Sequence, residues 1–248
     1  MFVRHNSHCV FDGAAVLNDR STFQLRLPAA DTLLTFAVKA EAGPFQKLAR
    51  PLQRSQILVT GIGARNAGES IRRVLSRELP KLVLTCGFAG GLNPELATGT
   101  VIFSADEDSA LSPALLAAGA RRAGFHCAER VVTTAEEKRA LRQGTGADAV
   151  EMESGVIRAI CREHNVPSAT VRVISDAADE DLPLDFNRLM NADQNLAYGR
   201  LAAALLKSPG KIGALLKLQK QTRAAAEKLA EVLVKVISDP ARGRSERE

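Results

Sequence analysis

The sequence has little of several features that would assign a protein to a special class. Its 248 residues contain no Trp, one Tyr and four Cys, and the cysteines (Cys9, Cys86, Cys127, Cys161) form no CxxC pair. Proteins that bind single-stranded nucleic acid stack bases on aromatic side chains, so this composition argues against a nucleic-acid partner. Irregularly spaced cysteines indicate reduced thiols, as is usual in cytosolic proteins.

Long apolar runs are also missing. No stretch approaches the roughly 18 apolar residues of a membrane span, and the amino terminus has no apolar signal-peptide segment. His5, His8 and Cys9 form a cluster that is too short and too terminal for a metal site, so we expect no metal. With 46% hydrophobic and 25% charged residues, the chain is typical of a globular protein, which we expect to be cytoplasmic.

Short apolar runs rich in β-formers alternate with helical patterns over most of the chain. Near-continuous apolar strands indicate burial on both faces of a sheet. The predicted strands are Leu33–Val38, Gln56–Thr60, Lys81–Gly87, Gly99–Ala105, Glu129–Thr134 and Ser168–Ser175. The predicted helices are Ala64–Glu78, Ser112–Gly124, Thr134–Gln143 and Met152–His164. This order predicts a three-layer α/β/α domain with a mixed, mostly parallel central sheet.

The two ends of the chain differ from this pattern. Residues 1–30 are predicted to be an irregular extension with a strand at Thr22–Leu27, and residues 239–248 a disordered tail. Ser208 and Pro209 are a good helix start, and an amphipathic pattern then runs to Asp239. We therefore expect one domain over residues 31–238 that includes an extra carboxyl-terminal helix.

The first glycine-rich turn, VTGIGARNAG, follows a strand and opens a helix. Gly61, Gly63 and Gly68 are spaced GxGxxxxG, which differs from the dinucleotide fingerprint. The next strand ends Thr85-Cys86-Gly87, without the acidic residue that would hold a nicotinamide ribose. Hydride transfer is therefore disfavoured.

The second turn, TCGFAGGLNPEL, carries three glycines within five residues. Gly87, Gly90 and Gly91 would let the backbone approach a ligand at the carboxyl end of a strand, although one glycine would serve a simple tight turn. We favour a binding loop. Cys86 has no histidine at a motif spacing to activate it, which favours a packing thiol over a nucleophile.

Carboxylates stand at both ends of the apolar segment that runs from VEMES to VISDAAD. Asp176 ends a predicted strand, where open α/β sheets place their ligand crevice, or it caps the next short helix. Glu151 and Glu153 flank Met152, so only one of them can point into the crevice; alternatively both stabilise a helix amino terminus. We expect Glu153 and Asp176 to face the crevice and Glu151 to face outward.

Together, GFAGGLNPELATGTVIFSADE, AVEMES and VPSATVRVISDAAD resemble the purine nucleoside phosphorylase and nucleosidase superfamily. The motifs stand in that family's order and, with the GIG turn, cover residues 33 to 190. Within it, the chain is most similar to methylthioadenosine/S-adenosylhomocysteine nucleosidases and hopanoid-associated phosphorylases. The latter also share VVTTAEEKRAL and a carboxyl-terminal helix rich in Leu, Ala and Lys.

The resemblance implies a role for each matching residue. Glu153 would bind the ribose 2′- and 3′-hydroxyls, with Met152 packed against the sugar. Asp176 would face purine N7 with Ser175 beside it, and Glu41 would stand where nucleosidases keep a catalytic carboxylate. The glycine turn would add further substrate contacts from Cys86, Gly87, Phe88 and Ala89.

These residue types suit the breaking of a ribosidic C–N bond. The sugar develops oxocarbenium character and the departing base develops negative charge. A carboxylic acid at N7 can protonate the base, a carboxylate under the hydroxyls favours the cationic sugar, and Glu41 can activate water.

The chain departs from the family pattern where phosphate would bind. Phe88 stands where Ser is frequent and Leu84 where an Arg can stand; Arg65 and the backbone at Gly63 could still serve a phosphate. The segment from Arg130 to Val150 has no aromatic side chain to stack on the base, which predicts a more open pocket or one completed by a partner subunit.

We therefore expect hydrolysis of a purine, adenine-type nucleoside without a cofactor. The alternatives are phosphorolysis, with inorganic phosphate as co-substrate, and a non-catalytic nucleoside-binding protein on the same fold. The resemblance favours a homodimer or larger homo-oligomer. A peripheral membrane contact through the basic residues of the last helix is disfavoured against a solvated helix face; these residues are Lys207, Lys211, Lys217, Lys220, Arg223, Lys228 and Lys235.

Overall fold

The computed structural model describes residues 16–17, 31–49, 55–106, 109, 111–191 and 209–238. Within these ranges the strands form one sheet in the order β1-β3-β2-β4-β9-β5-β6, and β8 joins β4 to β7. The strands are β1 Val16–Leu17, β2 Thr32–Phe36, β3 Ser55–Val59, β4 Leu82–Gly91, β5 Val101–Ser104, β6 Arg121–Arg122, β7 Phe125–Cys127, β8 Ala149–Glu151 and β9 Ser168–Asp176.

The sheet is mixed but mostly parallel. β1, β3, β2, β4 and β9 pair in parallel, whereas β5 runs antiparallel to β9 and β8 antiparallel to the end of β4. Every residue of β9 is buried, as expected for a central strand covered on both faces.

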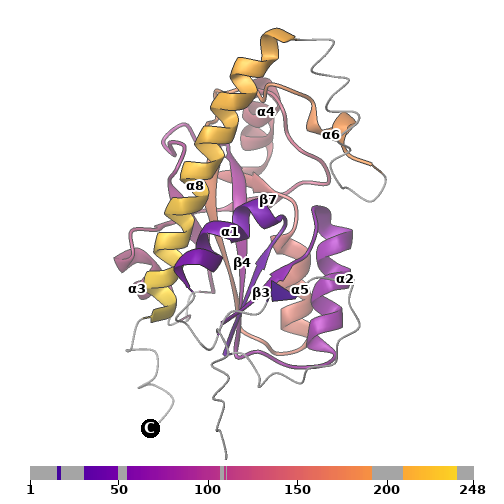
Figure 1. The fold of residues 1–248 in the computed structure, drawn as a ribbon, viewed down its shortest axis with the longest axis vertical. Coiled ribbons are helices and arrows are strands. Elements are labelled where there is room, and N and C mark those ends of the chain that lie inside the picture. Colours follow the sequence, from indigo (N-terminus) through magenta and orange to yellow (C-terminus); the bar gives the residue numbers. More distant parts are fainter. Residues whose placement is uncertain are drawn as a thin grey trace, which may run out of the picture.

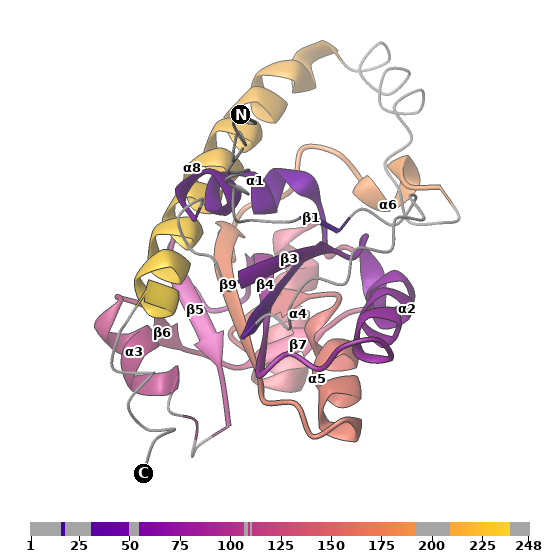
Figure 2. The ribbon, with the colours of Figure 1, turned by 60° about the horizontal axis from the view of Figure 1, so that its bottom comes forward.

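Helices cover both faces of this sheet (Figure 1). The helices are α1 Lys39–Leu48, α2 Gly63–Leu75, α3 Leu111–Ala117, α4 Ala135–Thr145, α5 Ser154–Glu163, α6 Phe186–Leu189, the 3-10 turn η1 Pro209–Lys211, and α8 Ile212–Ser238. Figure 2 shows α8, α1 and α3 on one side of the strands and α2 with α5 on the other. The predicted three-layer α/β fold with an extra carboxyl-terminal helix is thus confirmed.

Two hydrophobic cores hold these layers together. On one face, Phe36 and Phe45 pack with Leu229 and Leu233 of α8. On the other face, Ile71 of α2 packs with residues of α5 and the sheet, among them Ile157 and Ile160. The carboxyl-terminal half of α8 is therefore an integral part of the domain.

Two predictions of secondary structure, both between residues 112 and 134, are wrong. The helix predicted at Ser112–Gly124 ends at Ala117, because Gly119 adopts φ +95° and its N–H bonds back to the Leu116 carbonyl, a left-handed helix stop. No strand forms at Glu129–Thr134, where the Asn187 side chain binds both the N–H and the carbonyl of Val131. That pairing satisfies backbone groups which a neighbouring strand would otherwise bind.

Other predictions fall partly outside the described residues. The strand predicted at Thr22–Leu27 and the tail at 239–248 lie there, so the division into segments stays a prediction. Ser208, the predicted start of the last helix, lies there as well. None of the described helices combines the length and the apolar character needed to cross a membrane.

Candidate active site

The predicted carboxylates come together at one edge of the sheet, where its parallel strands end. Glu41 follows β2 in the first turn of α1, and Gly63 follows β3 at the start of α2. Gly87 lies in the second half of β4, and Asp176 is the last residue of β9. Open α/β sheets bind their ligands at this edge, since loops from adjacent strands meet there.

Glu41 is buried and held by backbone donors from two strands' ends. Its Oε2 accepts hydrogen bonds from the N–H groups of Ala37 (2.9 Å) and Val38 (3.1 Å), and its Oε1 from Phe88 (2.8 Å). Burial raises the pKa of this carboxyl above its ordinary value, against the opposing effect of Arg172. A positioned carboxylate with a raised pKa is suited to take a proton from water.

Glu153 stands where β8 leads into α5. Its Oε1 accepts the Gly63 N–H at 2.8 Å, and its Oε2 lies 3.3 Å from Arg172 Nη2. Burial raises the pKa of Glu153 to about 7; Arg172 opposes this shift and Glu151 adds to it. The turn after β3 and the turn after β8 are thereby joined by one carboxylate.

Arg172, which sequence reasoning missed, organises this cluster from the middle of β9. The guanidinium is 1% exposed and donates to Glu151 Oε2 (2.5 Å), to Glu153 Oε2 and to the Cys86 carbonyl (2.9 Å). A buried charge needs such partners. The signal was present in the sequence, because SATVRVIS places one arginine inside an otherwise apolar strand.

The expectation that Glu151 faces outward is wrong. Glu151 is 5% exposed, and its carboxylate also accepts bonds from the Glu153 and Ser154 N–H groups. Burial alone would raise its pKa, but Arg172 and hydrogen bonds from Cys127 and Ser154 hold the pKa below its ordinary value. Glu151 is thus the charged partner of Arg172 and leaves Glu153 to carry the raised pKa.

Asp176 lies beside a β-bulge. β9 pairs with β4 residue by residue until Ala89 pairs with Ile174 and Gly90 with Asp176, which leaves Ser175 without a pairing residue on β4. Such a bulge re-aims the side chains that follow it. Ser175 Oγ donates to Asp176 Oδ1 at 2.5 Å and lies 3.3 Å from the Ala89 carbonyl.

A lysine that sequence reasoning missed completes this half of the site. Lys138 of α4 is fully buried, and its Nζ lies 2.5 Å from Asp176 Oδ2. In AEEKRAL the residue looks like one more charge on a solvated helix, and no pattern distinguishes it from its neighbours.

The remaining predicted substrate contacts line the same region. Met152 is 9% exposed between the two glutamates, and Phe88 is half-buried beside Glu41. Cys86 is buried with its Sγ 3.5 Å from the Leu84 carbonyl, and burial raises its thiol pKa. A thiol held protonated suits packing rather than nucleophilic attack.

Comparison with known proteins agrees with this geometry. Residues 120–207 match the model of the Phosphorylase superfamily. A curated relative, the 5′-methylthioadenosine/S-adenosylhomocysteine nucleosidase of Anoxybacillus flavithermus, is 27% identical over 168 residues, which cover 54% of this chain and 72% of the relative. The chain is therefore similar to members of the phosphorylase superfamily.

Solved structures share the fold of this chain. The Campylobacter jejuni 5′-methylthioadenosine/S-adenosyl homocysteine nucleosidase superposes with a TM-score of 0.62 at 16% identity, covering 84% of this chain and 98% of that one. The futalosine hydrolase of Helicobacter pylori strain 26695 gives 0.59 at 16% identity, covering 83% and 97%.

The fold does not bring Arg65 into the cluster. The Arg65 side chain is 70% exposed on α2 and pairs with Glu69 one turn along. The Gly63 N–H, the other predicted phosphate contact, is already bound to Glu153.

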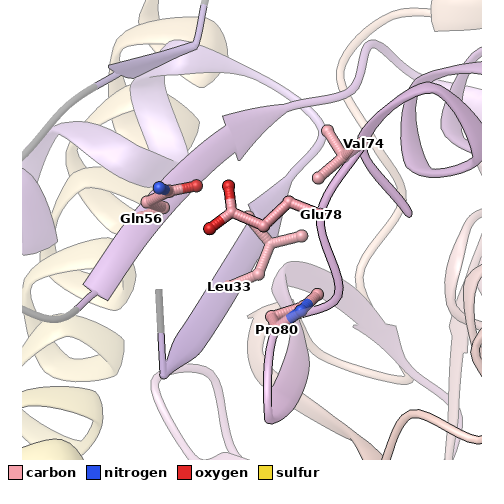
Figure 3. Close-up of a pocket in the computed structure, with 5 residues that line it drawn as sticks. All are labelled: Leu33, Gln56, Val74, Glu78 and Pro80. Carbon is pink, nitrogen blue, oxygen red and sulfur yellow. The ribbon is translucent and has the colours of Figure 1, made fainter. Parts of the chain in front are cut away.

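A small pocket lies at the opposite end of the strands (Figure 3). It is lined by Leu33, Gln56, Val74, Glu78 and Pro80, at the starts of β2 and β3 and before β4, and its volume is about 10 Å³. That volume holds about one water molecule, so this pocket cannot receive a nucleoside.

Proposed function

We propose that this protein hydrolyses the N-glycosidic bond of a purine, adenine-type nucleoside. The observation that carries the proposal is the convergence of Glu41, Glu153 and Asp176 at one edge of the sheet, each buried. The similarity to 5′-methylthioadenosine/S-adenosylhomocysteine nucleosidases supports the choice of substrate class.

Each carboxylate takes a separate part of the reaction. Glu153 accepts hydrogen bonds from the ribose 2′- and 3′-hydroxyls, and Met152 packs against the sugar. As the C1′–N9 bond breaks, its electron pair goes to the purine and Asp176 delivers a proton to N7. Glu41 takes one proton from a water molecule whose oxygen bonds to C1′. Negative groups under the sugar favour the oxocarbenium-like transition state.

Hydrolysis is favoured over phosphorolysis because the basic side chains that could bind a phosphate are already paired with carboxylates. In the cluster, Arg172 is engaged by Glu151 and Glu153, and Lys138 by Asp176; Arg65 lies outside the cluster and pairs with Glu69. A phosphate would have to displace one of these carboxylates. The proposal therefore needs no cofactor, with inorganic phosphate as co-substrate only in the phosphorolysis alternative.

Product analysis tests the proposal. Purified protein is incubated with adenosine and 5′-methylthioadenosine in phosphate-free buffer, and then with phosphate added. We expect adenine and free sugar at a rate that phosphate does not change. A rate that requires phosphate, with sugar 1-phosphate as product, would establish phosphorolysis instead. Adenine binding without turnover of either nucleoside would favour a non-catalytic binding protein.

Two variants check the assignment of the site. Glu153→Gln and Asp176→Asn should each lower kcat/KM by about 100-fold or more, the range expected for a positioned acid–base or charged group. Arg65→Gln is the matched control and should retain activity within about twofold, as is usual for an exposed residue. Full activity of both site variants would show that the site is misplaced.

The proposal extends to assembly and location. We propose a cytoplasmic homodimer or larger homo-oligomer, whose partner subunit would close the base pocket beside the segment from Arg130 to Val150. Light scattering after size exclusion gives the mass of the assembly.

A peripheral membrane contact is disfavoured, because Lys217, Arg223 and Lys228 pair with neighbouring glutamates. Failure to sediment with anionic liposomes at low salt would remove that alternative.

A further inference from the structure

Lys138 is the most completely buried charged group at the sheet edge. Its side chain has 0% exposure. Its Nζ lies 2.5 Å from Asp176 Oδ2, 2.7 Å from the Ala177 carbonyl and 2.8 Å from the Glu180 carbonyl. An ammonium group has three N–H donors, and these acceptors use all three. The site therefore fits the charged form of lysine.

This arrangement fixes the state of Asp176 before substrate binds. One carboxyl oxygen faces the ammonium of Lys138 and the other accepts the Ser175 hydroxyl at 2.5 Å. Both oxygens of the Asp176 side chain thus accept a hydrogen bond, and neither donates one. The proposed reaction nevertheless ends with a proton on the purine.

We propose that Lys138 is the source of that proton, and that Lys138 and Asp176 act as one acid. This proposal rests on the proposed function. As the C1′–N9 bond breaks, Lys138 Nζ gives a proton to the carboxylate and becomes a neutral amine. The carboxyl group gives one proton to N7 and is a carboxylate again. After the base leaves, the protonated Glu41 gives its proton to solvent and Lys138 takes one from solvent, so that both groups return to their starting states.

The exposure of the two side chains indicates which of them faces the substrate. Asp176 is 7% exposed at the end of β9, whereas Lys138 lies behind it on α4. Lys138 therefore acts through Asp176 and does not touch the substrate.

The charged groups around the pair are occupied elsewhere. The Glu180 carboxylate accepts the Ala177 N–H and Lys217 of α8, and Asp181 accepts the Ala135 N–H. Glu137 of α4 binds Arg130. On the sheet side, Asp176 lies close to Gly90 of β4, and Gly90 lies close to Val150 of β8; both are uncharged. Asp176 is thus the only described carboxylate that pairs with the Lys138 ammonium.

Lys138→Met tests the proposal because methionine keeps much of the length and removes the charge. Two substrates are compared: 5′-methylthioadenosine, whose base must be protonated, and 4-nitrophenyl β-D-riboside, whose leaving group departs as a stable anion. We expect Lys138→Met to lower kcat/KM on the purine nucleoside by about 100- to 1,000-fold, as for loss of a general acid. On the nitrophenyl riboside it should stay within about threefold. Lys217→Met is the matched control, because Lys217 of α8 binds the Glu180 side chain of the same loop, and it should match the wild type on both substrates.

The pH dependence supplies a second measurement that needs no folded variant. Between pH 8 and 9 Glu153 is mostly ionised, since its pKa is about 7. A shared proton predicts a wild-type kcat that is flat through this range. A lone carboxylic acid predicts a fall of about tenfold per pH unit. In Lys138→Met, the rate on the purine should show that fall.

Three results would overturn the proposal: full purine activity in Lys138→Met, equal loss on both substrates in a folded variant, or a wild-type kcat that falls tenfold per unit above pH 8. If the wild-type protein cleaves no purine nucleoside at all, the proposed function fails and this proposal fails with it. Wild-type cleavage with any of the three results removes the role of Lys138 alone.

Discussion

Glu151 and Glu153 show how two neighbouring carboxylates can carry different charge. Glu151 lies 2.5 Å from the shared guanidinium and Glu153 lies 3.3 Å from it. The closer carboxylate is held ionised, and the pKa of the farther one rises to about 7. A neutral-to-charged transition near physiological pH follows at the residue proposed to bind the ribose.

The first prediction concerns the pH dependence of substrate capture. The Glu153 carboxylate must be ionised to accept two hydroxyl hydrogen bonds, so kcat/KM should fall as pH decreases through about 7, the pKa of this group. The fall should approach tenfold per pH unit. Kinetics of 5′-methylthioadenosine cleavage from pH 5 to 8 measure it. Glu153→Gln, whose residual activity should lack this acidic limb, is the control; an identical limb in that variant would assign it to another group.

The second prediction concerns stability. The pKa of Glu153 is about 7 in the folded protein and 4.5 in the reference state, so the folded state binds more protons between these values. Its contribution is fully present below pH 4.5 and is lost as pH rises through 7. Glu153→Gln stays neutral and avoids this loss. Relative to the wild type, its free energy of unfolding should rise by about 2 kcal/mol between pH 5 and pH 8. Urea unfolding at both pH values measures the change, and equal differences at the two would contradict it.

At this scale, the sequence could predict the carboxylates but not their cations. Glu41, Glu153 and Asp176 stand in motifs, next to glycines or at strand ends. Arg172 and Lys138 come from elements that meet the site only in the folded chain. Burial of Lys138 follows from the loop after Asp176 closing over α4, through the Ala177 and Glu180 carbonyls. No local sequence pattern predicts a contact between residues that are about 40 positions apart, as Lys138 and Ala177 are.

Among the elements, β4 contacts both parts of the site, the part around Glu41 and the part around Ser175 and Asp176. Its tail binds Glu41 through the Phe88 N–H, and its Ala89 carbonyl contacts Ser175. Gly87 adopts φ +142°, and a Cβ at this position would lie 2.6 Å from Arg172 Nη1 and 2.7 Å from Glu41 Oε1. The glycine is required because two buried side chains, those of Arg172 and Glu41, occupy the space of a methyl group.

The third prediction follows from this crowding. Gly87→Ala should lower the free energy of unfolding by about 2–4 kcal/mol, since it adds backbone strain and displaces the buried side chains of Arg172 and Glu41. Activity should fall with it. Gly144→Ala on α4 is the control, because a Cβ there would meet no packing neighbour within 4 Å and alanine favours a helix by about 0.5–1 kcal/mol. Urea unfolding compares the two; a Gly87→Ala protein as stable as the control would refute the crowding argument.

Element prediction succeeded where periodicity was strong. The strands at β2, β3, β4, β5 and β9 and the helices α2, α4 and α5 lie within a few residues of their predicted bounds. Helix α1 was not predicted, and it contains Gly43 and Pro44, two residues of low helix propensity. Burial of Ala42 and Phe45 against the core outweighs the weak local propensity.

At the scale of the whole molecule, α8 links the last part of the chain to its first layer. Leu229 is completely buried in the core that contains Phe36 and Phe45, whereas Leu216, near the amino-terminal end of α8, is 61% exposed. The helix thus has one half packed on the sheet and one half exposed to solvent.

The fourth prediction tests whether α8 belongs to the cooperative unit. Leu229→Ala should cost about 2–5 kcal/mol of unfolding free energy, as for a fully buried leucine, and the protein should still unfold in one transition. Leu216→Ala should change stability by less than about 0.5 kcal/mol. Circular dichroism during urea unfolding measures both. A separate, earlier transition in Leu229→Ala would show that α8 unfolds independently of the sheet.

The position of β9 in the sheet has a consequence for how the protein is made. β9 pairs with β4 on one side and β5 on the other, although both precede it by more than 60 residues. A ribosome therefore releases two apolar strands with unpaired edges before the strand that separates them exists. Unpaired strand edges favour aggregation, and non-local strand pairing is slow to form. The sheet closes only after synthesis passes Asp176, the residue on which the proposed chemistry also depends, so the nascent chain becomes a folded sheet and a potential catalyst at the same step.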